Sequence, residues 1–184
     1  MSKIVIGSPS DKKGITVTPS KIMFNANNVK KMMKGINVIW IAEPIALIPT
    51  MTSNTTPSGT VSASAETNHA YYAFDGNEDT NWYTYGNEGS YIQYKFEQAR
   101  CVRKISVQTY YSGSNGLIKK FKVQASNDGS TFINLTDTII NSNQSDKGKS
   151  EYTINNSEKY LYYRVYTVES GAYSGWRSIQ MYGN

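Results

Sequence analysis

The chain has 184 residues, a formal net charge of +5 and a single cysteine. It is long enough to bury one ordinary core, and it cannot form an internal disulfide. With one histidine and no phosphate-binding or catalytic-serine motif, the composition predicts a protein that is not an enzyme. Gly7, Pro9 and nearby charges interrupt residues 1–20, which excludes a signal peptide or membrane span there.

The first 45 residues carry the positive charge. They hold seven lysines against Asp11 and Glu43, and the remaining 139 residues are formally neutral. No arginine precedes Arg100 and no nucleic-acid-binding motif is present, so docking on an acidic protein surface is favoured over nucleic acid. Short apolar runs separated by turns predict a small β-rich arm. Such an arm is too small to fold comfortably alone, which favours attachment to other proteins or oligomerisation.

Pro44 and Pro49, followed by a polar run over residues 50–60, predict a boundary, and we divide the chain into residues 1–45 and 46–184. Beyond it, apolar and polar residues alternate with a period of two over residues 92–96, 121–125 and 161–165. Turn signals recur and no long stretch has helical periodicity. The pattern predicts an all-β antiparallel sandwich. Cys101, at the start of a strand-like run, is interpreted as a small buried hydrophobic residue.

Residues 73–82 concentrate oxygen-bearing side chains around a glycine. Asp75, Asn77 and Thr80 lie within six residues, and Gly76 permits a sharp turn between them. Calcium takes such oxygen ligands in a flexible geometry. The alternative is a turn in which Asp and Asn side chains bond their own backbone. The local spacing leaves both interpretations open.

Four further motifs lie on either side of this loop, one before it and three after it. They are Ser-Ala-Ser-Ala-Glu at residues 62–66, then residues 121–129, 162–165 and 179–183. Over residues 50–184 this order resembles the discoidin family, also called coagulation factor type C domains, whose bacterial members include the family-32 carbohydrate-binding modules. The resemblance implies a jelly-roll sandwich of about eight strands.

The resemblance also implies a cation site. Its ligands would be the side chains of Asp75, Asn77 and Thr80, with carbonyls near Tyr72 and Arg177. The family usually supplies a glutamate where this chain has Ser178, and calcium affinity depends on the number of charged ligands. We therefore expect weak calcium binding, or a replacement of the ion by the Arg177 guanidinium against the Asp75 carboxylate.

In family-32 modules, loops at one end of the sandwich hold the sugar through aromatic and polar side chains. Trp82 is expected to pack beneath the cation loop, and Trp176 in the core or at its rim. Tyr83 is a further loop tyrosine outside the selected set. The residues selected here for carbohydrate binding are His69, Tyr85, Tyr110, Tyr111, Asn115 and Tyr173.

Residues 22–40 resemble short attachment segments of phage tail and fibre proteins and of phage-tail-like bacteriocins. We therefore predict a multicopy component of a virion or phage-tail-like particle that is assembled in the cytoplasm. In this prediction, residues 1–45 bind other particle proteins, and the sandwich binds bacterial surface glycan. The alternative is a decoration protein of a capsid or tail that binds no sugar. Convergence of Tyr85, Tyr110 and Tyr173 with His69 and Asn115 on one open groove would favour adhesion.

Overall fold

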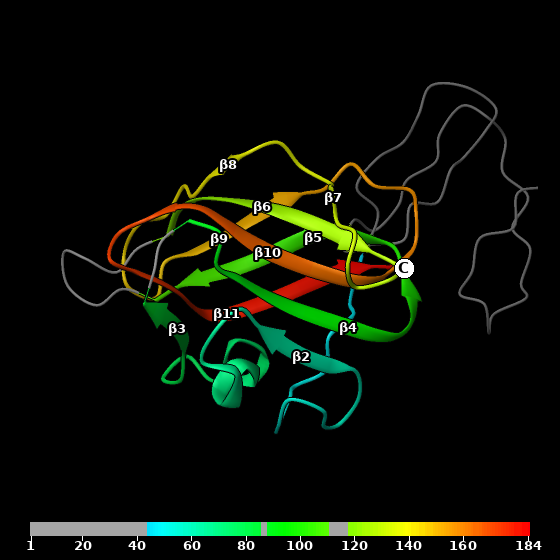
Figure 1. Cartoon of the computed structure of the whole chain (residues 1–184), viewed down its shortest axis with the longest axis horizontal. Coiled ribbons are helices and arrows are strands. Elements are labelled where there is room, and N and C mark those ends of the chain that lie inside the picture. The colour runs from blue at the N-terminus through cyan, green and yellow to red at the C-terminus, as the bar shows by residue number, and fades with distance from the viewer. Residues whose placement is uncertain (1–43, 86–87, 111–117) are drawn as a thin grey trace, which may run out of the picture. The chain divides into compact units, whose positions relative to one another are not determined.

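The computed structural model describes residues 44–85, 88–110 and 118–184 (Figure 1). Contacts divide the chain into Met1–Glu43 and Pro44–Asn184, and the predicted β-rich arm lies outside the described residues. Within the second of these units, β1 (Ile45–Ala46) pairs with β11 (Tyr173–Gly183). Within the described ranges, no helix is long and apolar enough to cross a membrane.

Two antiparallel sheets build the described part of the chain, which confirms the all-β prediction. The first runs β1-β11-β5-β9, with β3 paired to β11. The second runs β2-β4-β10-β6-β7, with β8 paired to β6, and Figure 1 shows β2, β4, β10 and β6 following one another across the molecule. The other elements are β2 (Thr60–Ala63), the short 3-10 helix η1 (Thr67–Phe74), β3 (Trp82–Tyr85), β4 (Tyr91–Arg100), β5 (Val102–Thr109), β6 (Ile118–Ser126), β7 (Ile133–Asn134), β8 (Ile139–Ile140), β9 (Lys149–Thr153) and β10 (Tyr160–Ser170).

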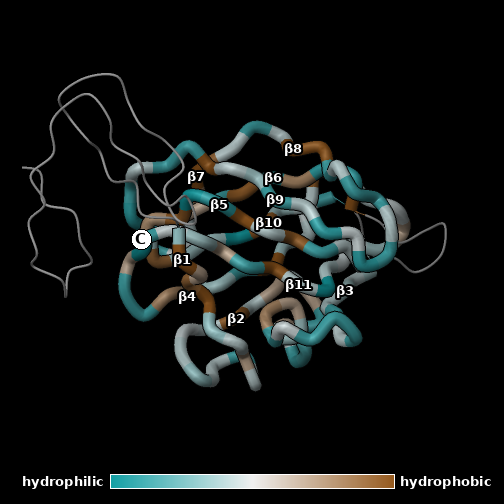
Figure 2. The backbone as a smooth tube through the Cα atoms, turned by 180° about the vertical axis from the view of Figure 1, so that it is seen from behind, coloured by the Kyte–Doolittle hydropathy of each residue, from teal (hydrophilic) through white to brown (hydrophobic). Residues whose placement is uncertain are grey.

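The hydrophobic alternation places the core between the sheets. Every second residue of β4 and β6 in the predicted stretches is buried: Ile92, Tyr94, Phe96, Phe121, Val123 and Ala125. In Figure 2, hydrophobic segments fall mainly on the strands, whereas much of the connecting chain is hydrophilic. On β10, Tyr163 and Val165 are buried but Leu161 is only half-buried. The pairing of β10 with β4 shifts register between Tyr160 and Tyr162, which breaks the alternation at Leu161.

The two tryptophans and the cysteine occupy the interior, as predicted from the sequence. Trp82 is buried and donates from its indole N–H to the Ala65 carbonyl at 3.1 Å. Trp176 is fully buried and packs edge-on against Phe121. Cys101 is buried as a free thiol. These large side chains lie under the strands that carry the candidate site, so they hold its backbone in place.

Candidate functional site

Four tyrosines gather where β3 and β11 meet. Along β3, Trp82 and Thr84 are buried while Tyr83 and Tyr85 face outward, and Tyr85 keeps 70% of its surface exposed. Tyr173 of β11 is paired directly opposite Tyr85, with ring centroids 4.9 Å apart. The period of two along a strand therefore puts three tyrosines on one side of this strand pair.

Tyr110 joins this group from the other side of β11. It follows β5, and its ring stacks on that of Tyr83 at 5.2 Å between centroids. Gly175 of β11 makes this approach possible, because a Cβ there would lie 2.8 Å from both the Tyr110 ring and the Tyr83 Cβ. We call Tyr83, Tyr85, Tyr110 and Tyr173 the tyrosine cluster.

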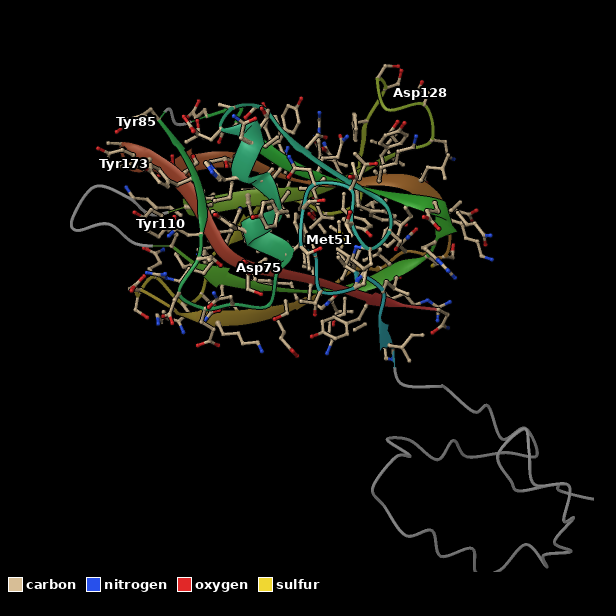
Figure 3. All side chains as sticks on the ribbon, turned by 90° about the horizontal axis from the view of Figure 1, so that it is seen from below. Met51, Asp75, Tyr85, Tyr110, Asp128 and Tyr173 are labelled. Carbon is tan, nitrogen blue, oxygen red and sulfur yellow. The ribbon has the colours of Figure 1, made fainter. Side chains whose placement is uncertain are left out.

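Figure 3 shows three labelled members of the tyrosine cluster at one end of the molecule, Tyr85 and Tyr173 together and Tyr110 nearby. Tyr83 connects them, with its centroid 6.2 Å from that of Tyr85 and 6.1 Å from that of Tyr173. Tyr85 and Tyr83 keep 70% and 36% of their surface exposed, so the tyrosine cluster presents aromatic surface to solvent. The arrangement can contact the apolar face of a ligand ring and hydrogen-bond its polar groups.

A groove of about 510 Å³ adjoins the tyrosine cluster, with Tyr83 as the shared wall. His69 of η1 lies in this groove and stacks on Tyr72, with centroids 5.2 Å apart and ring planes 16° from parallel. Glu66, at φ +50° in the left-handed region, precedes η1 and also lines the groove. Such a backbone is uncommon for a residue other than glycine.

The surroundings of Tyr83 disfavour ionisation of a phenol that is already neutral at pH 7. The neighbouring Tyr85 phenol, partial burial, Tyr110 and the Glu66 carboxylate raise the pKa of Tyr83 above its ordinary value, in that order of effect. A neutral phenol both donates and accepts hydrogen bonds. Tyr83 therefore offers the groove a polar group with both capacities at neutral pH.

The loop over residues 75–80 is closed by its own hydrogen bonds. One Asp75 carboxylate oxygen accepts the Asn77 backbone N–H at 2.9 Å, and the other accepts the Thr80 hydroxyl at 2.7 Å. The structure thus brings together the three predicted side-chain ligands in the turn arrangement that the sequence left open. In the described part of the chain, no group of three or more His, Cys, Asp or Glu side chains could hold a metal ion.

Arg177 does not occupy the position expected for it. Its guanidinium forms two bonds to the Asp146 carboxylate, at 2.9 and 3.1 Å, and donates to the Glu78 carbonyl at 3.1 Å. The expected contact with Asp75 is therefore wrong, because Asp146 from a distant loop offers Arg177 a two-pronged partner. Of the three predicted side-chain ligands only Asp75 carries a carboxylate, and that carboxylate already accepts two hydrogen bonds, while the Asp79 carboxylate is paired with Lys147. This donor set is a poor fit for a divalent cation, and calcium binding stays a prediction.

Arg177 also connects the loop to the tyrosine cluster. Its guanidinium carbon lies 5.4 Å from the centroid of the Tyr110 ring. A second link runs from Lys147 to Asp79 at 2.8 Å, and this bond lowers the pKa of the Asp79 carboxyl. The Lys147–Asp79 ion pair joins the loop over residues 75–80 directly to the segment that contains Asp146 and Lys147, and Arg177 joins them indirectly by bonding both Asp146 and the Glu78 carbonyl.

Of the six residues selected for carbohydrate binding, the structure brings Tyr85, Tyr110 and Tyr173 together and puts His69 in the adjoining groove. Tyr111 and Asn115 lie outside the described residues. Tyr83, at the centre of the tyrosine cluster, was not selected. The sequence did contain a signal for Tyr83: it follows Trp82, which was expected in the interior, and it lies two residues before Tyr85, so the two tyrosines share one face of a strand. Nothing local in the sequence points to the role of Gly175 or Asp146.

The family follows from a match over most of the sandwich. Residues 52–181 match the model of the F5/8 type C domain. The chain belongs to this family. The matched range of this F5/8 type C domain contains β2 to β10, most of β11 and the closed loop over residues 75–80, whereas β1 precedes it. No curated protein matches the chain significantly.

Solved structures share the fold of this F5/8 type C domain. CpGH89CBM32-5 from Clostridium perfringens, in complex with GalNAc-β-1,3-galactose, is 17% identical, with a TM-score of 0.59 over 72% of this chain and 100% of that one. The family 32 CBM of C. perfringens NanJ, in complex with galactose, is 21% identical, with a TM-score of 0.57 over 71% and 98%. An F5/8 type C domain from Bacteroides fragilis is 16% identical, with a TM-score of 0.59 over 68% and 91%. At these identities the likeness establishes the fold.

Proposed function

We propose that this F5/8 type C domain binds carbohydrate at the tyrosine cluster and the groove beside it. The observation that carries the proposal is the convergence of four tyrosines from β3, β11 and the end of β5 at one end of the sandwich, with Tyr85 70% exposed. Exposed aromatic rings supply contact area at small entropic cost, and their hydroxyls orient a polar ligand. Two solved structures of the same fold hold galactose-containing ligands, which supports this ligand class.

The proposed role is adhesion of a virion or phage-tail-like particle to bacterial surface glycan. It rests on the resemblance of residues 22–40 to attachment segments and on the seven lysines of the first 45 residues. Several copies on one particle would convert weak single-site affinity into strong attachment, because linked sites bind at a high effective concentration. The protein acts here by binding alone, without catalysis.

The test is binding of the full chain to an array of bacterial cell-wall and capsular glycans, with calcium and again with a chelator. Tyr85→Ala combined with Tyr110→Ala is expected to lower affinity at least about ten-fold, the loss of roughly 1.4 kcal/mol of contact energy. Tyr182→Ala, the same change at the opposite end of β11, is the matched control and should leave affinity unchanged.

The same experiment separates adhesion from decoration. If a folded chain binds no glycan on a broad array, the tyrosine cluster instead contacts other particle proteins. If the double variant loses its cooperative melting transition, Tyr85 and Tyr110 are structural residues and the proposed site is misplaced. A narrow glycan preference that the double variant loses would establish the ligand class.

A further inference from the structure

The outward face of the six-stranded sheet presents a regular polar and aromatic surface. Three strands contribute alternate residues to it: β4, β10 and β6, with β10 in the middle (Figure 1). Residues of the opposite phase, such as Tyr94, Val165 and Val123, are buried in the core. The cross-strand register makes three rows, Lys95–Tyr162–Ser126, Gln93–Arg164–Gln124 and Tyr91–Tyr166–Lys122. We call these nine residues the sheet face.

Arg164 occupies the centre of the sheet face and is held by aromatic rings. Its guanidinium carbon lies 3.8 Å from the Phe132 ring centroid and 4.9 and 5.5 Å from those of Tyr91 and Tyr166. Its Nε donates to the Gln124 side-chain carbonyl at 2.6 Å. Within the described ranges, its two Nη groups donate to no acceptor. Those donors are oriented and available for a ligand.

The nine residues of the sheet face carry charge of one sign, and the Asp128 carboxylate at its border already accepts the Ser126 hydroxyl at 2.8 Å and two backbone N–H groups. The only ionisable acid or base side chains of the sheet face apart from tyrosine are Lys95, Lys122 and Arg164. Among the residues that the structure describes, none of these three forms an ion pair. The nearby Glu169 is already paired, with Lys120 at 2.6 Å and Lys119 at 3.7 Å. Burial of Arg164 lowers the pKa of its guanidinium, and the neighbouring Tyr91 and Tyr166 oppose this shift.

We propose that the sheet face is a second ligand site, which binds a carboxylate-bearing polysaccharide. A planar guanidinium held by stacked rings matches a carboxylate, to which its two free Nη groups can donate together. Tyr91 and Tyr166 flank Arg164 and offer contact to the sugar ring, while Lys95 and Lys122 meet neighbouring negative charges. The site lies on the other sheet from β3 and β11, so it is separate from the tyrosine cluster.

The test is calorimetric titration of the full chain with polygalacturonate, with its methyl ester as the uncharged probe and poly-L-glutamate as a polyanion without sugar. We expect binding to polygalacturonate alone. Arg164→Gln should weaken it about ten-fold, the loss of a charged two-pronged contact. Lys95→Gln with Lys122→Gln keeps the central ring contacts and should weaken it about five-fold.

The matched control is Lys12→Gln with Lys13→Gln, which removes two charges from the lysine-rich first 45 residues. It should change affinity less than about two-fold, whereas general attraction of a polyanion would fall equally in both double-lysine variants. The proposal would be overturned if the two double-lysine variants lost equal affinity for polygalacturonate. It would also be overturned if poly-L-glutamate or the methyl ester bound as tightly as polygalacturonate, or if polygalacturonate did not bind. The variant with both Tyr85→Ala and Tyr110→Ala should bind polygalacturonate with unchanged affinity. The proposals for the sheet face and for the tyrosine cluster are therefore tested independently of each other.

Discussion

Two loops of this domain carry the same sequence signal and lie far apart in the structure. One contains Asp75 and Gly76, the other Asp128 and Gly129, and Figure 3 shows Asp128 near the end opposite the tyrosine cluster. Both glycines adopt positive φ, +69° and +75°. In both loops the aspartate accepts backbone N–H and hydroxyl donors. A density of oxygen-bearing side chains thus marks a closed turn as readily as a cation site.

The loops differ in what surrounds them. Nothing but Thr50, at 3.9 Å, would meet a Cβ at Gly76, whereas a Cβ at Gly129 would lie 2.9 Å from the Tyr162 ring. The loop with Asp75 is tied through Glu78 and Asp79 to Arg177 and Lys147. The loop with Asp128 depends on local bonds, three of which reach the same carboxylate oxygen. Both loops therefore combine local bonds with long-range contacts, which are ion pairs and a carbonyl bond in the first loop, and the Tyr162 ring and the Leu161 N–H, donated to Asn127 at 3.0 Å, in the second.

The largest expected effect separates the two glycines. Gly129→Ala combines a left-handed backbone with overlap on Tyr162, so we expect it to lower the free energy of unfolding by about 2–4 kcal/mol. Gly76→Ala has only the backbone penalty and should cost about 1–2 kcal/mol. Urea denaturation of both variants measures the difference. Equal losses would mean that Tyr162 moves aside freely.

The next largest effect is expected for the contacts of Arg177 with Asp146 and with the Glu78 carbonyl. Arg177→Gln removes two bonds to Asp146 and one to the Glu78 carbonyl from a side chain that is 11% exposed, and should cost about 1–2 kcal/mol. Lys104→Gln, which breaks an exposed pair with Glu151, is the control and should cost less than about 1 kcal/mol. Thermal melting compares the two. A change at Arg177 no larger than at Lys104 would show that these contacts contribute no more than a surface pair.

A smaller effect depends on pH. Backbone N–H groups of Thr131 and Ser130, with the Ser126 hydroxyl, hold the pKa of Asp128 well below its usual value. Its ionised form therefore favours folding at neutral pH, and this contribution falls as the pH drops below about 4 towards the folded-state pKa. Asp128→Asn should lower the melting temperature at pH 7, and the difference from wild type should shrink at pH 3. A difference that is constant with pH would contradict this assignment.

The smallest expected effect concerns the cation. Because the loop over residues 75–80 is closed by its own bonds, we expect a chelator to shift the melting temperature by no more than about 1 °C. Differential scanning calorimetry with calcium and with chelator measures this shift. A fall of several degrees on chelation, absent in Asp75→Ala, would show that the loop opens to hold calcium.

Regular local patterns were the predictable part of this domain. The alternation along β4 and β6 and the interior positions of Trp82 and Trp176 follow from side chains pointing to opposite faces of a strand. Tyr83, Tyr85 and Tyr173 were expected in loops, whereas the structure places them in β3 and β11. The register shift in β10 was not predictable, because it depends on the neighbouring strand β4.

By itself, the sequence determined the all-β class through a period of two along the chain. The order of its motifs indicated the family, and the family resemblance led to most of the aromatic residues of the candidate site. Only the tertiary structure decided which distant residues meet: Tyr110 with Tyr83 over Gly175, and Arg177 with Asp146. Strand pairing and loop packing join positions separated by tens of residues, and side-chain chemistry then selects among the partners that this pairing brings within reach.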